Sequence, residues 1–277
     1  MNPTGNATAD RYTLADLLQV MARLRNPEGG CPWDLAQDFR SIVPSTLEEC
    51  YELIQAIEDE DFAHVGEELG DLLFQVVFYA QLGAEQGLFD FGDIVHTLVS
   101  KLVRRHPHVF ADGNLAQAAE TEISGDEVKR QWEAIKRQER LEKSKAGRLD
   151  DVPLALPALS RAQKLQKRAA GFGFDWPGAD AALGKISEEL AELSAALAGG
   201  KDDEVSEEMG DLLFSCVNVS RKLGLDSEAL LRRASSKFER RVRAMERFAA
   251  EQGDVLEDLN DSELDRLWNR AKRSGSS

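Results

Sequence analysis

Two short segments combine carboxylates with apolar residues at helical spacing, and each type occurs twice in the chain. KISEELAELSAAL begins at Lys185 and EEMGDLLFSCVNV at Glu207, while STLEECYELIQAI begins at Ser45 and EELGDLLFQVVFYA at Glu67. Each half of the chain therefore carries an EExxE block and then an ExxD block. Helix-borne carboxylates of this kind can hold a hard divalent cation, and such a cation commonly serves a phosphate substrate.

Drawn on a helix, the carboxylates of the first second-half block lie beside an apolar stripe. The apolar stripe consists of Ile186, Leu190, Leu193 and Leu197. The charged sector next to it consists of Lys185, Glu188, Glu189 and Glu192. Glu208 and Asp211 share one face of the next helix. Its apolar continuation LLFSCVNV predicts a buried helix with Cys216 as a packing residue. Carboxylates that point inward need compensating cations.

All the clustered ligands are oxygen atoms, which suits Mg²⁺, with Mn²⁺ as a possible substitute. Neither block contains a histidine, and His64 only precedes the first-half ExxD block. A di-iron bundle carries Glu-x-x-His on its helices, so its absence here disfavours an oxygenase or a ferritin. The alternative is that the carboxylates form an ordinary solvent-exposed acidic helix face. This alternative is reasonable for a single block but less so for a pair of blocks that occurs twice.

A phosphate substrate also needs cationic side chains, and a nucleoside base needs a stacking surface. Lys237 and Arg241 share a helix face four residues apart, with Arg240 beside them, although a basic solvated face would give the same pattern. Trp268 is the better candidate for contact with a ligand. Phe172 and Phe174 are expected to be ordinary core aromatics.

The composition limits the class of protein. The chain has 277 residues and a net charge of −16, which disfavours stable nucleic-acid binding. Three cysteines without CxxC spacing argue against a disulfide framework. The N-terminal residues lack the apolar core of a signal peptide, and charges interrupt the apolar runs before membrane-spanning length. We expect a cytoplasmic protein without membrane association.

Further matched blocks extend the duplication. SKLVRRHPHVF from Ser100 faces SKFERRVRAMERF from Ser236, and QWEAIKR with Trp132 faces LWNRAKR with Trp268. The periodicity is helical throughout and predicts an all-α fold of two tandem four-helix-bundle-like domains. Ser45 is expected to cap a helix, and Gly87 and Gly224 to end helices. The expected organisation is a domain over 1–142 with a mobile excursion at about 112–126, a linker over 143–157, and a catalytic domain over 158–277.

The duplicated EExxE, ExxD and SK-x-x-RR blocks, the late tryptophan and the first-half GCPWD closely resemble the MazG family. The resemblance covers the chain from about Leu14 to Lys272, and GDLLFQVVFYAQ and RRHPHVF are specific to it. It implies an all-α, Mg²⁺-dependent nucleoside triphosphate pyrophosphohydrolase that forms homodimers. It also implies a role in nucleotide-pool cleaning or alarmone control.

The resemblance assigns roles to second-half residues. The implied metal ligands are Glu189, Glu192, Glu208 and Asp211. The implied catalytic residues are Glu188, Glu189 and Lys185. The implied substrate-binding residues are Lys185, Glu188, Glu189, Glu204, Glu207, Lys237, Arg240, Arg241 and Trp268.

The first half keeps much of this pattern. Ser45 stands where the second half has Lys185, but Lys101, Arg104 and Arg105 are present. The resemblance therefore places catalysis in the second half. A secondary metal site is expected in the first half at Glu48, Glu49, Glu52, Glu68 and Asp71.

Two other functions stay open at this point. One is a non-catalytic dimer that binds a nucleotide or alarmone and passes a signal to a partner. The other is a structural helical dimer in which the acidic clusters are solvent-exposed and bind no ligand. Pyrophosphate release on turnover separates the enzyme from the sensor. Thermal stability that does not respond to metal would favour the structural dimer.

Overall fold

The computed structural model describes residues 11–116, 123–143 and 147–274, and all regular structure in these ranges is helical. The all-α prediction is therefore confirmed. By its contacts the chain divides into two compact units, Met1–Glu142 and Lys143–Ser277. The expected mobile excursion includes residues 117–122 and the expected linker includes 144–146, which lie outside the described residues. Among the described helices, none has the length and apolar character needed to span a membrane.

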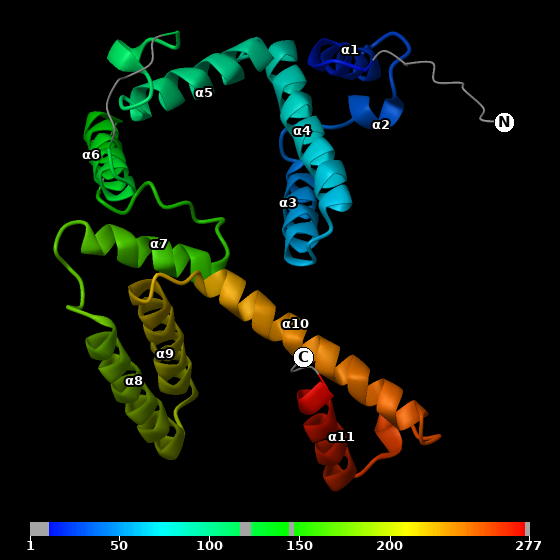
Figure 1. Cartoon of the computed structure of the whole chain (residues 1–277), viewed down its shortest axis with the longest axis vertical. Helices are drawn as coiled ribbons and strands as arrows, with labels where there is room; N and C mark the ends of the chain where they lie inside the picture. Colours follow the sequence, from blue (N-terminus) through cyan, green and yellow to red (C-terminus); the bar gives the residue numbers. More distant parts are fainter. Residues whose placement is uncertain (1–10, 117–122, 144–146, 275–277) are drawn as a thin grey trace. The chain divides into compact units, whose positions relative to one another are not determined.

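The first unit consists of the helices α1 (Leu14–Leu24), α2 (Pro32–Leu35), α3 (Val43–Glu58), α4 (Phe62–Glu85), α5 (Phe91–Arg105) and α6 (Gly125–Lys143), with a 3₁₀ turn at Ala111–Gly113. Figure 1 shows α3 and α4 as an antiparallel pair, with α1 on the C-terminal half of α4. A capping box joins Thr13 and Asp16 at the start of α1, and Asp90 and Asp93 form another at the start of α5.

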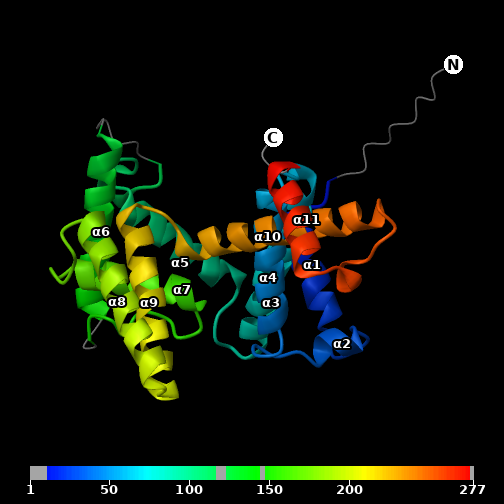
Figure 2. The ribbon, with the colours of Figure 1, turned by 90° about the horizontal axis from the view of Figure 1, so that it is seen from below.

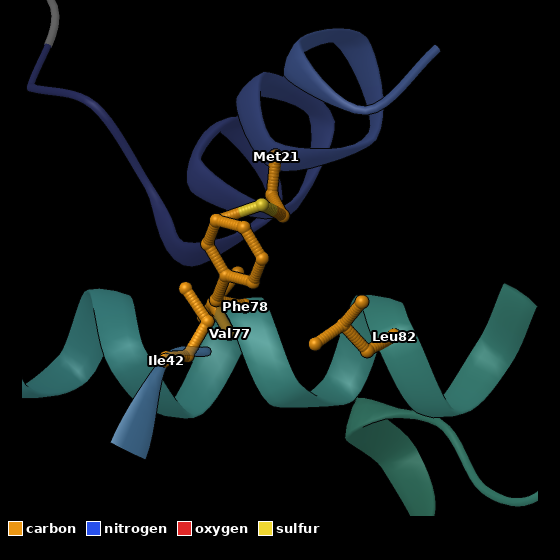
Figure 3. Packing of buried hydrophobic residues seen from close by; sticks show 5 residues of the cluster. All are labelled: Met21, Ile42, Val77, Phe78 and Leu82. Atoms are coloured by element: carbon orange, nitrogen blue, oxygen red, sulfur yellow. The ribbon is translucent and has the colours of Figure 1, made fainter. Parts of the chain in front are cut away.

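A small apolar core holds α1, α3 and α4 together. Met21 of α1 and Phe78 of α4 lie against each other and are fully buried (Figure 3). Ile42, just before α3, and Val77 and Leu82 of α4 complete the cluster. This core fixes α4, and with it the acidic ExxD block about two turns before Val77.

The second unit consists of α7 (Ala158–Ala170), α8 (Ala179–Gly199), α9 (Asp202–Lys222), α10 (Ser227–Ala250) and α11 (Asp261–Ser274), with a 3₁₀ turn at Leu256–Asp258. α8 and α9 run side by side as a hairpin, seen clearly in Figure 2. α7 packs against α9 and α10, and α11 packs on the C-terminal half of α10 (Figure 1). A second core, between α10 and α11, is built from Met245, Ala249 and Leu267 with their neighbours.

The turns of the two acidic hairpins use the same backbone conformation. Gly200 ends α8 with φ +68°, a left-handed conformation that glycine adopts without steric cost. At the matching position after α3, Glu60 has φ +57°. Gly87 and Gly224 follow the ends of α4 and α9, as predicted, also with positive φ. Ser45 does not cap α3, because this helix begins two residues earlier, at Val43, with Pro44 in its first turn.

Candidate active site

Three carboxylates from the α8–α9 hairpin converge in the second unit. Oxygen atoms of Glu189 and Glu192 on α8 and Glu208 on α9 all lie within 4.8 Å of one another. Glu189 is buried, Glu208 is half-buried and Glu192 is exposed. Glu189 and Glu192 are three residues apart and so share a face of α8, which the hairpin brings against Glu208. The sequence predicted that these three residues act together, and the structure brings them together.

Lys185 provides the local positive charge. Its Nζ lies 2.7 Å from Glu189 Oε1 and 2.9 Å from Glu188 Oε1. Hydrogen bonds to Glu189 and then Glu188 raise the pKa of Lys185, so the ammonium keeps its proton at any physiological pH. One ammonium cannot balance the carboxylates that surround it, so the second unit keeps a net negative charge at this point.

The effect of the uncompensated negative charge is seen in the pKa of Glu208. Burial raises the pKa of Glu208, and the neighbouring Glu192, Glu189, Asp211 and Glu207 raise it further. Like charges about 4 Å apart repel by roughly 1 kcal/mol in bulk water and about 4 kcal/mol near a protein surface. Folding therefore gains nothing from the cluster, whereas a divalent cation would be coordinated by it. The donor set consists of carboxylate oxygens alone, which fits a hard cation.

The other acidic residues predicted in the second half lie at the edge of this cluster. Asp211 is exposed, one turn after Glu208, and lies outside the group of three converging oxygens, although its charge acts on Glu208. Glu188 and Glu207 are exposed. Glu204 accepts from Lys201 Nζ at 2.6 Å. A bound cation could draw Asp211 in, since its carboxylate lies on the same face as Glu208.

The first unit repeats the arrangement on α3 and α4 with a different set of three. Oxygen atoms of Glu49, Glu68 and Asp71 lie within 4.8 Å of one another. Glu68 is only 5% exposed, and its Oε2 is buried without a hydrogen-bond partner. Its Oε1 lies 2.6 Å from His64 Nε2, so an exposed histidine stands beside this cluster. An unpartnered buried carboxylate oxygen on a member of an acidic cluster fits a cation ligand.

Burial raises the pKa of Glu49, and Asp71, Glu52, Glu68 and Glu48 raise it further. Glu48 and Glu52 are themselves exposed. All five acidic residues predicted for this half therefore lie close enough to interact electrostatically, although the oxygen atoms of only three converge.

A cationic and aromatic group forms separately on α10 and α11. The Arg241 guanidinium lies 5.5 Å from the centre of the Trp268 ring, and Phe238 packs on the same ring at 5.6 Å. Lys237 and Arg240 are exposed on α10. Within the described residues, no hydrogen bond or ion pair joins this group to the carboxylates of the α8–α9 hairpin. Each group is therefore held by contacts of its own within the described residues.

Several residues expected to be buried are exposed. Leu190 and Leu197 of the predicted apolar stripe are 53% and 62% exposed, whereas Glu189 and Leu193 are buried. The reason is that, among the described helices, α8 packs chiefly on α9, so mainly the face toward α9 is covered. The expected burial of α9 and of Cys216 is likewise wrong, because α9 leaves Leu213, Phe214 and Cys216 exposed. Phe172 and Phe174 are also exposed, not core aromatics.

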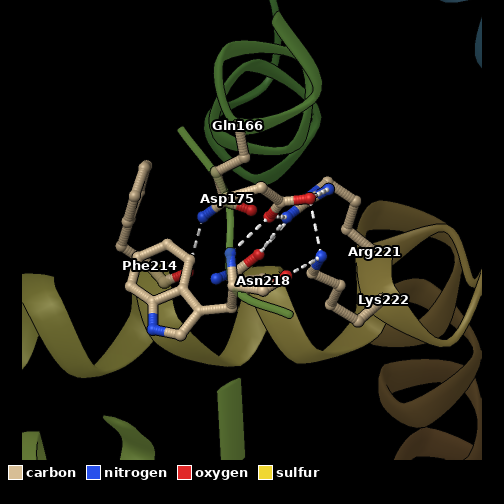
Figure 4. A network of polar contacts seen from close by, with 7 residues as sticks. Gln166, Asp175, Phe214, Asn218, Arg221 and Lys222 are labelled. Atoms are coloured by element: carbon tan, nitrogen blue, oxygen red, sulfur yellow. Dashed lines mark hydrogen bonds and ion pairs between the residues drawn. The ribbon is translucent and has the colours of Figure 1, made fainter. Parts of the chain in front are cut away.

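A polar network that sequence reasoning missed fixes the loop before α8. Asp175 accepts hydrogen bonds from Arg221 and Lys222 at the end of α9, with Lys222 Nζ at 2.6 Å, and Arg221 also donates to Asn218 (Figure 4). Gln166 of α7 donates to the Phe214 carbonyl at 2.9 Å. The sequence signal that could have predicted it is the acidic Asp175 in GFGFDW together with the basic pair Arg221 and Lys222 at the end of α9. This network anchors the start of the helix that carries Lys185.

Two helical units, each with a carboxylate cluster on a helix hairpin, define a class of duplicated all-α proteins suited to hold a divalent cation. The model of the MazG nucleotide pyrophosphohydrolase domain matches the chain twice, at residues 37–110 and 179–248. The chain belongs to the MazG family. Both matches contain one acidic hairpin, so the predicted duplication is confirmed.

Similar proteins support the same assignment over almost the whole chain. A nucleoside triphosphate pyrophosphohydrolase of Escherichia coli K12 is 48% identical over 259 residues, which are 93% of this chain and 96% of that protein. The nucleoside triphosphate pyrophosphohydrolase/pyrophosphatase MazG of Thermotoga maritima is 45% identical over 258 residues, 93% of this chain and 94% of its own length. The uncharacterized protein YabN of Bacillus subtilis is 41% identical over 256 residues, half of its length.

Proposed function

We propose that this protein hydrolyses nucleoside triphosphates, both ribo- and deoxyribo-, to the monophosphate and pyrophosphate with Mg²⁺, and that the second unit is the principal catalyst. The observation that carries the proposal is the convergence of Glu189, Glu192 and Glu208 within 4.8 Å in a chain of this family. The relatives named for this activity match more than nine-tenths of the chain.

Mg²⁺, or Mn²⁺ in its place, would be held by Glu189, Glu192 and Glu208, with Asp211 available on the same helix face. When bound, the cation neutralises the triphosphate and lowers the pKa of an attacking water. The donor chemistry supports this choice, since the ligands are carboxylates without histidine or thiolate. Mg²⁺ also retains several waters in its shell, so a partly open site such as this one suits it.

The chain's own residues then position the reactants. Glu188 or Glu189 takes the proton of the attacking water; Glu188 is the freer of the two, because it lies outside the three converging carboxylates. Lys185 holds both side chains and can also contact a phosphate oxygen. Positioning and electrostatic stabilisation carry most of the acceleration in phosphoryl transfer. No covalent intermediate is needed.

Lys237, Arg240 and Arg241 bind the phosphates and stabilise the charge of the leaving pyrophosphate, and Trp268 stacks on the base. The Arg241–Trp268 contact supports this role, because it places a guanidinium and a stacking ring side by side. Stacking accepts any base, so the ring itself confers little base preference. Glu204 and Glu207 line the same side of α9 as the metal ligands and take part in substrate binding.

A homodimer forms part of the proposal. Within the described residues, no hydrogen bond or ion pair joins the carboxylates to the cationic group, and the chain exposes apolar side chains on three helices. These are Leu190 and Leu197 of α8, Leu213 and Phe214 of α9, and Leu231 and Phe238 of α10. Soluble proteins usually cover groups of large apolar side chains when these gather in one patch. A second copy that packs on these stripes would cover them and complete the site.

The first unit is proposed to hold a secondary metal site at Glu48, Glu49, Glu52, Glu68 and Asp71, with little or no turnover. It lacks a counterpart of Lys185, since Ser45 stands there. A cytoplasmic location is also part of the proposal, as is a role in nucleotide-pool cleaning or alarmone control, which the family resemblance implies. Domain bounds of 1–142 and 158–277, with a linker between, remain our proposal for the organisation.

Product analysis tests this function. Nucleoside and deoxynucleoside triphosphates are incubated with the protein, with and without Mg²⁺, and pyrophosphate and orthophosphate are quantified separately. We expect pyrophosphate and monophosphate only when Mg²⁺ is present. Orthophosphate instead would mean cleavage at the γ-phosphate and would overturn the proposal. Nucleotide binding without any product would identify a sensor.

A further inference from the structure

A single carboxylate in the first unit engages two arginines at once. Glu139 of α6 accepts from Arg104 Nε at 3.0 Å and Nη2 at 2.6 Å through Oε1. It accepts from Arg105 Nη2 at 2.5 Å and Nε at 3.2 Å through Oε2. The Glu139 side chain is 13% exposed, so this contact is not a loose surface pair. Both arginines lie in the last turn of α5.

The duplication matches these arginines to residues of the second unit. SKLVRR from Ser100 matches SKFERR from Ser236, so Arg104 and Arg105 are the first-unit counterparts of Arg240 and Arg241. Those second-unit residues are the proposed phosphate ligands. No carboxylate in the part of the chain that the structure describes pairs with either of them. Within the described residues, Arg240 and Arg241 therefore have no carboxylate competing with a substrate, whereas Arg104 and Arg105 are both paired with Glu139.

The carboxylate itself is also specific to the first half. With Trp132 matched to Trp268, position 139 corresponds to Gly275, which has no side chain. Only the first repeat therefore has an internal anion at this place in its sequence.

The chemistry of the contact is that of phosphate recognition. A guanidinium offers paired N–H donors that fit a carboxylate or a phosphate in the same bidentate way. Two guanidinium charges face one carboxylate charge, so the arginine pair can accept a more highly charged anion than Glu139. Hydrogen bonds, first from Arg105, lower the pKa of Glu139 to about 2, and the internal anion is ionised throughout the physiological range.

Space is available beside the pair. A cavity of about 600 Å³ opens next to Arg104, between α5 and the segment that contains Phe110 and Leu115. Arg104 remains half exposed toward solvent. An incoming anion can thus reach Arg104 before Glu139 has left.

From this geometry we propose that Arg104 and Arg105 form a polyphosphate-binding site in the first unit, and that Glu139 occupies it as a built-in competitor. The inference rests on the proposed function, which identifies the matching second-unit arginines as phosphate ligands. It predicts that two repeats with similar acidic hairpins differ in phosphate binding, because the arginine pair of the first repeat is neutralised by a carboxylate of its own chain. A tethered competitor commonly acts at an effective concentration in the millimolar range.

The test uses the full-length chain in which all four proposed phosphate ligands of the second unit are removed by Lys185→Ala, Lys237→Ala, Arg240→Ala and Arg241→Ala. Binding in this background then reports on the first unit. Inorganic tripolyphosphate is titrated calorimetrically, with EDTA present so that metal clusters do not contribute. In this background Glu139→Gln is expected to tighten binding at least tenfold, since the competing charge is lost. Arg104→Ala with Arg105→Ala, added to Glu139→Gln, should abolish the gain.

Asp126→Asn is the matched control, because Asp126 is an exposed acid on the same helix, and it should leave the affinity within twofold. Glu139→Asp keeps the charge but shortens the side chain, and an intermediate affinity is expected. The proposal is overturned if Glu139→Gln and Glu139→Asp bind tripolyphosphate as the parent does while their circular dichroism is unchanged. It is also overturned if the parent already binds as tightly as Glu139→Gln. Nucleotide turnover by the native chain, measured separately, shows whether the underlying function has failed instead.

Discussion

Glu208 illustrates how residues of the acidic hairpins oppose folding while they serve binding. Its raised pKa means that the folded protein holds the proton more tightly than the unfolded chain does. The contribution to stability is then fully present at low pH and is lost as pH rises through the raised folded value. At neutral pH the ionised cluster costs stability unless a cation is bound.

We therefore expect Glu208→Gln to raise the thermal unfolding midpoint of the metal-free protein at pH 7, because it removes one of the repelling charges. The same variant should lose most of the additional stabilisation that Mg²⁺ gives to the native chain. Differential scanning calorimetry with EDTA and with Mg²⁺ measures both effects. Glu239→Gln, an exposed glutamate of α10, serves as control. A lower midpoint for Glu208→Gln without metal would contradict the electrostatic account.

Helix geometry alone was enough to predict which carboxylates lie close together. Glu189 and Glu192 share a face of any helix, and the ExxD block of the next helix had to lie near them once the two helices form a hairpin. The identity of the converging third residue could not be predicted. The matched pairs Glu189 with Glu208 and Glu49 with Glu68 converge in both units, but the third residue is Glu192 in the second unit and Asp71 in the first. The choice depends on side-chain rotamers and helix register.

At the scale of elements, the two acidic hairpins have the same turn conformation but carry different residue types at one turn position. Gly200 and Glu60 both have positive φ, which costs a residue with a side chain roughly 1–2 kcal/mol. Gly200→Ala should therefore destabilise the protein by about 1 kcal/mol, and Glu60→Gly should stabilise it by up to about 1 kcal/mol after the entropy cost of glycine. Urea unfolding midpoints measure both changes. Equal destabilisation by the two substitutions would show that the turns are not held as described.

The loop before α8 supplies the second prediction at this scale. Asp175 has its pKa lowered to about 2, first by the hydrogen bond from Arg221 and then by Lys222. Its stabilising contribution is present above the unfolded value near 3.8 and is lost as pH falls toward 2. Asp175→Asn should cost about 1–2 kcal/mol at pH 7 after allowance for solvent screening. The deficit should shrink to a small fraction near pH 2 and vanish only below it.

Chemical unfolding across this pH range measures the Asp175→Asn effect. Asp265→Asn, on the exposed side of α11, should cost little at either pH. A deficit of the same size at pH 2 and pH 7 would mean that the ion pairs do not carry the effect.

Helix periodicity predicted the elements but not their burial. The stripe through Leu190, Leu193 and Leu197 has the right spacing for a core face, yet only Leu193 is covered within the chain. Periodicity identifies an apolar face and cannot say whether the same chain covers it. The polar network of Asp175 was also missed, since its members are far apart in sequence.

At the scale of the whole molecule, the uncovered apolar faces predict association. Sedimentation velocity at micromolar concentration should give a dimer, and Leu213→Glu should shift it toward the monomer because it places a charge in the apolar contact. Tyr12→Glu, at a side chain that is 95% exposed in the first unit, should leave the dimer intact. A native chain that remains monomeric at all concentrations would contradict the proposal that two copies complete the site.

The central claim is that the carboxylates of the second unit, and not those of the first, support pyrophosphate release. The most direct measurement compares Glu189→Gln with Glu49→Gln, which are matched positions of the two repeats, in Mg²⁺-dependent release of pyrophosphate from nucleoside triphosphate. We predict a loss of about a hundredfold or more in kcat for Glu189→Gln and a change of less than about threefold for Glu49→Gln. Equal activity of the two variants, or a loss confined to Glu49→Gln, would contradict the account.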